Sequence, residues 1–339
     1  MKALVVERYK KKGALRLTEM PEPRMGASDV LIRVHATAIN QLDSKLRDGD
    51  FKAFLPYRPP FIPGHDLAGT ILTVGADVRG FAPGDAVYAR PRDMRIGTFA
   101  PVIAVEAADI ARKPATLSME EAAAIPLVGL TAWQALVEIG KVQPGQKVFI
   151  QAGSGGVGTL AIQLAKHLGA TVATTTSAGN ADLVRALGAD IVIDYRQQDV
   201  TEVLSGYDLV LHSQDAKALD ASLAVLKPGG HLISISGPPD VAFATSLGLN
   251  PVLRLVMWLL SHRTVARARR RGIRYSFLFM RADGPQLAAL ARLIDAGVIR
   301  PVVDRVFPFA QTQAALDYVE TGRARGKVVI ARPDPDHPR

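Results

Sequence analysis

The glycine-rich stretch QAGSGGVGTL, residues 151–160, is the part of the sequence whose residue types and spacing most clearly predict chemistry. It follows the apolar, strand-like segment KVFI and opens a helix-like segment. In such a place Gly153 permits a tight turn, Gly155 lets a diphosphate approach the backbone, and Gly158 lets the helix pack on the strand. The free N–H groups and the dipole of the new helix favour an anion. We therefore expect a dinucleotide here, bound by a loop that consists of Gly153, Ser154, Gly155, Gly156, Val157 and Gly158.

The strand after this helix indicates which dinucleotide binds. It ends in ATTTSAGN, residues 173–180, which carries hydroxyls and an amide but no acid. A site for NAD usually has an Asp or Glu here to bind the ribose 2′-hydroxyl. A carboxylate repels a 2′-phosphate, whereas hydroxyls can donate hydrogen bonds to it. We therefore expect NADPH as the cofactor.

The remaining sequence predicts the elements that position these residues. Residues 1–120 consist mostly of strand-like segments such as DVLIRVHATAIN, separated by Gly, Pro and Asp. The pattern then changes, because Ser118 and Glu121 form a capping-box pattern that predicts a helix through IPLVGLTAWQALVEIG. From there to HLISIS, residues 231–236, short apolar runs alternate with amphipathic helices. This alternation predicts repeated βαβ units and a buried parallel sheet.

Composition narrows the possible functions. The chain has 339 residues, and a prior of ~150 residues per domain predicts two domains. Its hydrophobic fraction of 48% allows a sizeable core, and no run of ~18 apolar residues predicts a membrane span. The absence of cysteine excludes disulfides, a thiolate nucleophile and cysteine metal ligands. The N-terminus reads as a strand and not as a signal peptide, so we expect a cytoplasmic protein.

The net charge of +9 is concentrated in one segment. Seven arginines between Arg263 and Arg281, with no acid among them, supply +7, so the rest of the chain carries +2 (9 − 7). They follow the strongly apolar NPVLRLVMWLL, residues 250–260. We interpret the segment as a packed helix with one solvated face. Binding to nucleic acid, to a membrane surface or to a partner subunit is the alternative.

Several long motifs occur in an order that resembles the medium-chain dehydrogenase/reductase superfamily, in particular its zinc-free quinone oxidoreductase (zeta-crystallin-like) and enone reductase branch. They are IPGHDLAGTILTVGADVRGFAPGDAVYA, AAAIPLVGLTAWQAL, VFIQAGSGGVGTLAIQLAKHLGA, LGADIVIDY and RGKVVI. The resemblance implies an α/β fold in which a Rossmann doubly wound parallel sheet domain is inserted in a partly β (GroES-like) catalytic domain, with the active site in the cleft. We expect residues 1–122 to begin the catalytic domain, 123–265 to bind NADP, and 266–339 to complete the sheet and the catalytic domain.

The resemblance also bears on metal binding. In zinc-dependent relatives a cysteine near AIN, the histidine of GH and a cysteine near IPLVG bind the metal. Of this set the chain keeps only His65, and Asn40 and Leu127 lie near the cysteine positions. Neither replaces a thiolate. We therefore expect no zinc, and we expect His65 to be a hydrogen-bonded structural residue of a tight turn.

Further cofactor contacts follow from the resemblance. Some relatives have a lysine at the position of Asn180. For Lys327, the alternative to a cofactor contact is that it is an ordinary charged residue on the surface. In chain order, the implied contacts are Thr131 near the nicotinamide and phosphates, Thr175, Thr176, Ser177 and Tyr195 around the 2′-phosphate, Ser236 and Gly237 beside the ribose, Leu278 and Phe279 at the carboxamide, and Lys327 at a phosphate.

Without a metal, hydride must be transferred to an acceptor that is already electrophilic, such as an enone, an enal or a quinone. Negative charge then develops on the carbonyl oxygen, where the protein needs a donor, and the α-carbon takes a proton. The segment NQLDSKLRDG, residues 40–49, is similar to NPVDxKxRxG of plant-type enone reductases in this branch. We expect Lys45 as the cationic donor, Asn40 as an orienting residue and Tyr57 as a candidate proton donor. Their alternatives are an exposed helix lysine for Lys45 and a packing role for Tyr57.

Two hypotheses about the function of the protein therefore remain open. The first is a zinc-independent, NADPH-dependent oxidoreductase for a small hydrophobic enone, enal or quinone. The second is an NADPH-binding sensor, or a nucleic-acid-binding or protein-binding module, without significant catalysis. We expect the enzyme, as a homodimer that pairs through the edge of the Rossmann domain, with no nucleic-acid partner. Asp43 and Arg47 are expected to form a structural polar pair.

Overall fold

The computed structural model describes residues 1–332 of the chain. Contacts between residues divide the chain into two units, each of which has its own large sheet. The first unit consists of Met1–Leu130 and the chain from Arg281 onward. The second unit is the stretch between them, Thr131–Met280. The insertion of one unit within the other agrees with the fold that the sequence predicted.

Strand pairing sets the end of the second unit. β13 (Arg274–Phe277) pairs in parallel with β12 (Leu226–Ser234), so the chain up to Met280 belongs to this unit. The expected Rossmann domain, residues 123–265, therefore lacks its last strand. The expected segment 266–339 begins inside the second unit and ends outside the described residues.

The first unit contains a mainly antiparallel sheet. Within residues 1–332 its strand order is β14-β15-β3-β4-β5-β7, and β6 also pairs with β3. Val30, Ile32 and Val34 alternate along β3 and are buried in one apolar core, as the period of two in the sequence requires. The strands are β1 (Lys2–Val5), β2 (Arg16–Glu19), β3 (Asp29–Ile39), β4 (Leu67–Val74), β5 (Ala86–Ala89), β6 (Val102–Glu106), β7 (Ile110–Arg112), β14 (Val303–Pro308) and β15 (Lys327–Ala331).

The helix predicted from Ser118 is broken into parts. Its capping box is confirmed, since the Glu121 N–H donates to Ser118 Oγ at 3.1 Å and the Ser118 N–H donates to Glu121 Oε2 at 2.9 Å. The first helix, α2 (Met119–Ala123), ends before Pro126, which has no N–H with which to continue it. A second helix, α3 (Pro126–Trp133), begins at this proline and leads into a π-helical turn, η2 (Gln134–Ile139). The other helices of the first unit are α1 (Gln41–Asp48), η1 (Ala107–Asp109), α10 (Gly284–Asp295), η4 (Phe309–Gln311) and α11 (Thr312–Glu320).

The second unit is built on a parallel sheet. Its strand order, among the described residues, is β10-β9-β8-β11-β12-β13, and every neighbouring pair is parallel. Counted along the chain, this is the order 3-2-1-4-5-6 of dinucleotide-binding folds. The order reverses between β8 and β11, where such sheets bind ligands at the carboxyl ends of their strands. The remaining strands are β8 (Lys147–Ile150), β9 (Thr171–Thr176), β10 (Ile191–Asp194) and β11 (Tyr207–His212).

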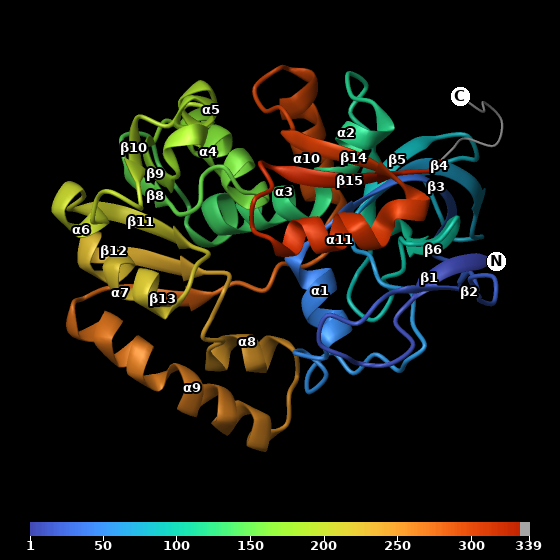
Figure 1. The fold of residues 1–339 in the computed structure, drawn as a ribbon, viewed down its shortest axis with the longest axis horizontal. Helices are drawn as coiled ribbons and strands as arrows, with labels where there is room; N and C mark the ends of the chain where they lie inside the picture. The colour runs from blue at the N-terminus through green and yellow to red at the C-terminus, as the bar shows by residue number, and fades with distance from the viewer. Residues whose placement is uncertain (333–339) are drawn as a thin grey trace. The chain divides into compact units, whose positions relative to one another are not determined.

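Helices cover this parallel sheet, which explains why most residues of strands such as β8 and β11 are buried. α4 and α5 pack against β8, β9 and β10, α7 packs against β11 and β12, and α9 packs against β13 (Figure 1). No helix within residues 1–332 combines the length and the hydropathy that crossing a membrane requires. The helices are α4 (Gly156–His167), η3 (Ala178–Asn180), α5 (Ala181–Ala186), α6 (Val200–Val203), α7 (Ala216–Val225), α8 (Val241–Ser246) and α9 (Pro251–Arg270).

Candidate functional site

The glycine-rich loop connects β8 to α4 in the second unit. It lies at the carboxyl end of β8, beside the point where the strand order reverses. The Gly153 N–H donates to the Thr175 carbonyl at 2.9 Å, so the loop is tied to the end of β9. α4 begins at Gly156, and Gly155 precedes it in an extended conformation with no side chain to cap the helix. The first N–H groups of α4 therefore point toward an open helix N-terminus, which favours an anion.

The three motif glycines differ in what surrounds them. A Cβ on Gly153 would lie 2.2 Å from Thr174 Oγ1, and one on Gly158 would lie 2.4 Å from the Ala152 carbonyl oxygen. These two glycines are therefore required by packing alone. A Cβ on Gly155 would meet only the Ala152 oxygen, at 3.2 Å. Packing within the protein therefore does not require a glycine at position 155. A ligand that approaches the backbone at this position would require one.

Hydroxyl and amide groups gather beside this loop at the end of β9. Thr176 Oγ1 donates to Ser154 Oγ at 2.9 Å. Asn180 Nδ2 donates to Ser154 Oγ at 3.2 Å and to Ser177 Oγ at 3.4 Å. Asn180 Oδ1 is buried and has no hydrogen-bond partner within the described part of the chain. We call Ser154, Thr176, Ser177 and Asn180 the hydroxyl–amide cluster. It forms a neutral polar surface next to the helix N-terminus.

Of the other predicted cofactor residues of this unit, Thr175 and Tyr195 lie at strand ends, and Thr131 lies on a helix. Thr175 Oγ1 accepts a hydrogen bond from the Ala152 N–H at 3.1 Å, within the glycine loop. Thr131 is buried in α3. Tyr195 follows β10, its ring is 57% exposed, and its N–H donates to the Thr176 carbonyl at 3.4 Å. Tyr195 therefore lies beside the hydroxyl–amide cluster.

A second group of predicted residues surrounds Ser234 at the end of β12. The Gly237 N–H donates to Ser234 Oγ at 3.1 Å, and the Leu278 N–H donates to the Ser234 carbonyl at 2.8 Å. Ser236 is exposed and donates to the Gln214 carbonyl at 2.7 Å. Phe279 follows Leu278 and is half-buried. The chain thus brings these four predicted residues to neighbouring strand ends of one sheet.

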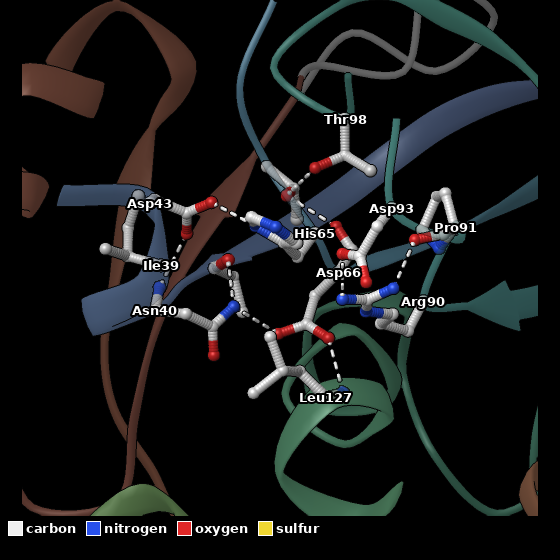
Figure 2. A network of polar contacts seen from close by, with 12 residues as sticks. Ile39, Asn40, Asp43, His65, Asp66, Arg90, Pro91, Asp93, Thr98 and Leu127 are labelled. Carbon is white, nitrogen blue, oxygen red and sulfur yellow. Dashed lines mark hydrogen bonds and ion pairs between the residues drawn. The ribbon is translucent and has the colours of Figure 1, made fainter. Parts of the chain in front are cut away.

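The first unit contains a buried polar network (Figure 2). The Asp66 carboxylate accepts hydrogen bonds from Asn40 Nδ2 at 2.8 Å and from the Leu127 N–H at 2.7 Å. The Asp43 carboxylate accepts one from the Asn40 N–H at 2.8 Å and lies 2.6 Å from His65 Nδ1. His65 is fully buried and hydrogen-bonded, which agrees with the structural role expected for it.

Lys327 completes this network, and its position differs from both roles expected for it. It is 5% exposed, and its ammonium group donates to the Ile39 carbonyl at 3.0 Å, to Asn40 Oδ1 and to Asp66 Oδ2 at 3.1 Å. These bonds use all three ammonium hydrogens. Lys327 is therefore neither a surface charge nor, in this geometry, a donor with a hydrogen to spare for a phosphate. Its role is to hold Asn40 and Asp66.

The remaining predicted catalytic residues lie in different surroundings. Lys45 is on the exposed side of α1, with its ammonium 5.9 Å from the centroid of the Phe51 ring. Tyr57 is buried and stacks on Phe61, with ring centroids 5.1 Å apart. Its hydroxyl accepts a hydrogen bond from the Met94 N–H at 2.8 Å, and burial raises the pKa of the phenol well above its usual value. This environment favours the packing role for Tyr57.

The expected pair of Asp43 and Arg47 is wrong. Asp43 pairs with His65, whereas the buried Arg47 pairs with Asp48 at 2.6 Å and with Glu320 at 2.8 Å. On α1 the two residues are four positions apart, but each finds a closer partner from the surrounding elements. Local spacing alone could not reveal this, because Glu320 lies on a distant helix, α11.

Asp66 is the central residue that the sequence reasoning missed. It accepts hydrogen bonds from three different segments and is fully buried. One signal was available, namely an acidic residue directly before the mostly apolar segment LAGTIL. A carboxylate buried at such a place requires a buried cation or several N–H donors.

These residues do not fit a zinc ion. Leu127 offers no side-chain ligand, and the ammonium of Lys327 lies beside Asn40 and Asp66. His65 Nε2 is buried and has no hydrogen-bond partner among the residues that the structure describes. Within residues 1–332, no three His, Cys, Asp or Glu side chains gather in a way that could hold a metal ion. A single imidazole beside an ammonium is a poor donor set for zinc.

Comparisons with known proteins agree with this architecture. Residues 26–115 match the family described as the alcohol dehydrogenase GroES-like domain, and residues 187–330 match the family described as zinc-binding dehydrogenase. The mitochondrial NAD(P)H oxidoreductase RTN4IP1 of Danio rerio is 34% identical, over 98% of this chain and 91% of that protein. The chloroplastic NADPH-dependent alkenal/one oxidoreductase of Arabidopsis thaliana is 34% identical, over 97% of this chain and 79% of that protein.

A solved structure extends the likeness to the fold. The quinone oxidoreductase of Coxiella burnetii superposes with a TM-score of 0.84 and 30% identity, over 98% of this chain and 99% of that one. The glycine loop, the strand order and these alignments along nearly the whole sequence lead to one assignment. The chain belongs to the medium-chain dehydrogenase/reductase superfamily, in its quinone oxidoreductase and enone reductase branch.

Proposed function

We propose that this protein is an NADPH-dependent oxidoreductase that reduces an activated carbon–carbon double bond or a quinone. The observation that carries the proposal is the alignment over 97% of the chain with a relative named as an NADPH-dependent alkenal/one oxidoreductase. The likeness to a quinone oxidoreductase of known structure supports the same class of reaction. The substrate is a small hydrophobic carbonyl compound or quinone.

The second unit supplies the residues that fit the cofactor. The N-terminal N–H groups of α4, beside Gly155, bind the diphosphate. The hydroxyl–amide cluster donates hydrogen bonds to the 2′-phosphate, and it has no carboxylate that would repel this group. Other contacts come from Thr131 on α3 and from the strand ends described above, namely Thr175, Tyr195, Ser236, Gly237, Leu278 and Phe279.

When bound, the reduced dinucleotide supplies a hydride to the electrophilic carbon of the substrate. The protein must then stabilise the negative charge that develops on the carbonyl oxygen. Lys45 is the residue that we propose for this task, because its ammonium group is exposed and has no ion-pair partner among the described residues. Asn40 is buried, with its amide held by Asp66 and Lys327, so we propose that it orients the start of α1, which carries Lys45, and does not contact the substrate itself. Solvent supplies the proton that the α-carbon takes, since Tyr57 is buried in packing.

A substrate panel tests the proposal. The purified protein is mixed with NADPH and with representative enones, enals and quinones, and the loss of NADPH absorbance is followed. Oxidation with at least one class is expected, with saturated ketone, saturated aldehyde or hydroquinone as the product. NADPH binding by calorimetry without oxidation in any of the mixtures would instead favour a cofactor-binding sensor.

The assembly is also a proposal. We propose a homodimer that pairs through β13, because this strand forms one edge of the parallel sheet and edges present unpaired backbone groups. Light scattering coupled to size-exclusion chromatography distinguishes a dimer from a monomer. A cytoplasmic location remains a prediction, which imaging of a tagged protein in its host would test.

A further inference from the structure

The helix α9, Pro251–Arg270, is attached to the second unit by a narrow stripe of mostly small residues. Met257, Ser261, Thr264 and Ala268 are its buried residues, and they recur at three- and four-residue spacing. α9 packs along β13 and α8, and the rest of its surface faces away from the sheet (Figure 1). The packing of this unit therefore buries one side of the helix, and within residues 1–332 most of the other side remains exposed.

The first half of that outer side is apolar. Six large apolar side chains are between 40% and 69% exposed. They lie within the nine-residue span 252–260 and are Val252, Leu255, Val256, Trp258, Leu259 and Leu260. Single exposed apolar residues are common on protein surfaces, but a contiguous group of this kind marks an interaction site.

The second half of the outer side is basic. Arg263, Arg267, Arg269, Arg270 and Arg271 are all exposed. Of these five arginines, only Arg267 has an ion-pair partner within the described part of the chain, and this partner is Asp220. No acidic residue occurs between Asp240 and Asp283 in the sequence. Cations near a helix C-terminus interact favourably with its dipole, but this effect is limited to the last turn and does not require five arginines.

We propose that α9 docks the protein on an anionic lipid surface. The helix is about 30 Å long, and its apolar and basic halves follow each other along its axis. The apolar half enters the boundary between headgroups and acyl chains, and the arginines bind lipid phosphates at the surface. The helix lies in the membrane surface and does not cross it. This inference is independent of the proposed reaction.

Charge complementarity favours lipid over the other possible occupants. In a symmetric pair the same surface meets itself, so the arginines of one copy would face either the arginines or the apolar half of the other. Neither arrangement supplies carboxylates to pair with the arginines, and both remove guanidinium groups from water, which is unfavourable. A nucleic acid would supply phosphates, but it would leave the six apolar side chains in water. An anionic membrane surface satisfies both halves of the helix.

Vesicle binding tests the proposal with a reporter that α9 itself contains. The chain has two tryptophans, and in a Trp133→Phe variant the only one left is Trp258, in the apolar half. This variant is titrated with vesicles of phosphatidylcholine alone, and with vesicles that also contain phosphatidylglycerol. Co-sedimentation and a blue shift of the Trp258 emission are expected with the anionic vesicles, and weaker binding with the neutral ones.

Paired variants separate the two contributions. Leu255→Asp with Leu259→Asp, and Arg269→Glu with Arg270→Glu, are each expected to weaken binding to anionic vesicles at least ~10-fold. Leu17→Asp on β2 is the matched apolar control, because Leu17 is also exposed, at 59%. Arg24→Glu with Arg323→Glu makes the same change in net charge on the first unit. Binding of both controls is expected to match the parent.

Each other outcome overturns the proposal. Vesicle binding without a blue shift, and unaffected by the two aspartates, means adsorption by charge alone. A blue shift that grows with protein concentration in the absence of lipid means that a second copy covers α9. Tighter binding to an oligonucleotide than to anionic vesicles means that the arginines serve a nucleic acid. No binding to either kind of vesicle leaves α9 without a role at lipid.

Discussion

The ammonium group of Lys327 lies 3.1 Å from the Asp66 carboxylate, and both side chains are buried. The two residues are 261 positions apart in the sequence. Lys327 begins β15 and Asp66 directly precedes β4, so the pair ties the last strand within residues 1–332 to the sheet that the N-terminal residues build. The first unit is therefore completed only when the end of the chain returns to it.

Removal of the Lys327 charge is expected to destabilise the protein strongly. Lys327→Met leaves the Asp66 carboxylate buried without a cation, which costs about 3–5 kcal/mol in comparable cases. Urea denaturation followed by circular dichroism measures the loss. Lys166→Met is the matched control, because Lys166 pairs with Asp190 at 2.9 Å on the surface and such pairs contribute at most ~1 kcal/mol. Equal losses of unfolding free energy in the two variants would show that the buried pair contributes no more to stability than the surface pair.

A substitution at Gly155 is expected to separate cofactor binding from folding. Gly155 has a φ of −81°, and an added Cβ meets only one atom at 3.2 Å, so Gly155→Ala should leave the free energy of unfolding nearly unchanged. The methyl group would obstruct the diphosphate, and the Kd for NADPH is expected to rise ~10-fold, equivalent to ~1.4 kcal/mol. Calorimetry measures the affinity.

Gly158→Ala is the matched comparison. Its Cβ would lie 2.4 Å from the Ala152 oxygen and 2.7 Å from the Cα of Gly153, so overpacking of ~1–3 kcal/mol is expected. The variant should be less stable as well as weaker in binding. If Gly155→Ala were the more destabilised of the two, the distinction between packing and ligand glycines would be wrong.

The local patterns in the sequence were sufficient for the parallel sheet of the second unit, except for its last strand β13, and for the start of α2. Short runs of β-branched and apolar residues such as TVATTT and YDLVLH, alternating with amphipathic helices, are typical of strands covered on both faces, so a parallel sheet was predicted from them. The Ser118 and Glu121 spacing fixed a helix start in the same way. The break before Pro126 was equally visible in the sequence, since proline cannot extend the preceding helix.

The polar network of the first unit could not be predicted from local patterns. Asn40 and Lys327 were each recognised as functional candidates, but with unrelated roles. They meet because β3 and β15 pair in antiparallel fashion, with Ile39 opposite Val328. Sequence periodicity specifies which face of a strand is buried, and it does not specify which distant strand becomes its neighbour. The partners of a buried charge therefore remain unknown until the topology is known.

Asn180 is expected to control the choice between NADPH and NADH. Its amide donates to Ser154 and Ser177, so Asn180→Asp introduces a carboxylate into the hydroxyl–amide cluster. A carboxylate repels the 2′-phosphate and can accept from a 2′-hydroxyl. The parent should bind NADPH at least ~10-fold more tightly than NADH, and the variant should lose most of this preference. Calorimetric titration of both proteins with both cofactors is the measurement. Equal affinities in the parent would contradict NADPH as the cofactor.

Acid is expected to weaken the second unit through its buried histidines. Burial lowers the pKa of His212 and that of His231 from 6.5 to about 4. Above pH 6.5 both rings are neutral in the folded and unfolded chains. Between pH 6.5 and about 4 the unfolded chain binds protons that the folded one does not, so the free energy of unfolding falls, by about 3 kcal/mol for each ring.

Denaturation as a function of pH measures this effect. His212→Gln removes one titrating ring from the core and should flatten the dependence between pH 6.5 and about 4. His167→Gln, at the exposed end of α4, controls for the loss of a histidine as such. A dependence that stays unchanged in His212→Gln would assign the acid sensitivity to other groups.

Lys45 is expected to contribute to the chemical step and not to cofactor binding. If its ammonium stabilises the negative charge on the substrate oxygen, Lys45→Ala should lower kcat ~10²-fold, the scale of losing one such donor. NADPH affinity should hold, because the predicted cofactor contacts belong to the second unit and Lys45 belongs to the first. Lys45→Arg keeps a cationic donor and should recover part of the rate. Lys52→Ala, an exposed lysine shortly after α1, is the control and should match the parent. An unchanged kcat in Lys45→Ala would remove this residue from the mechanism.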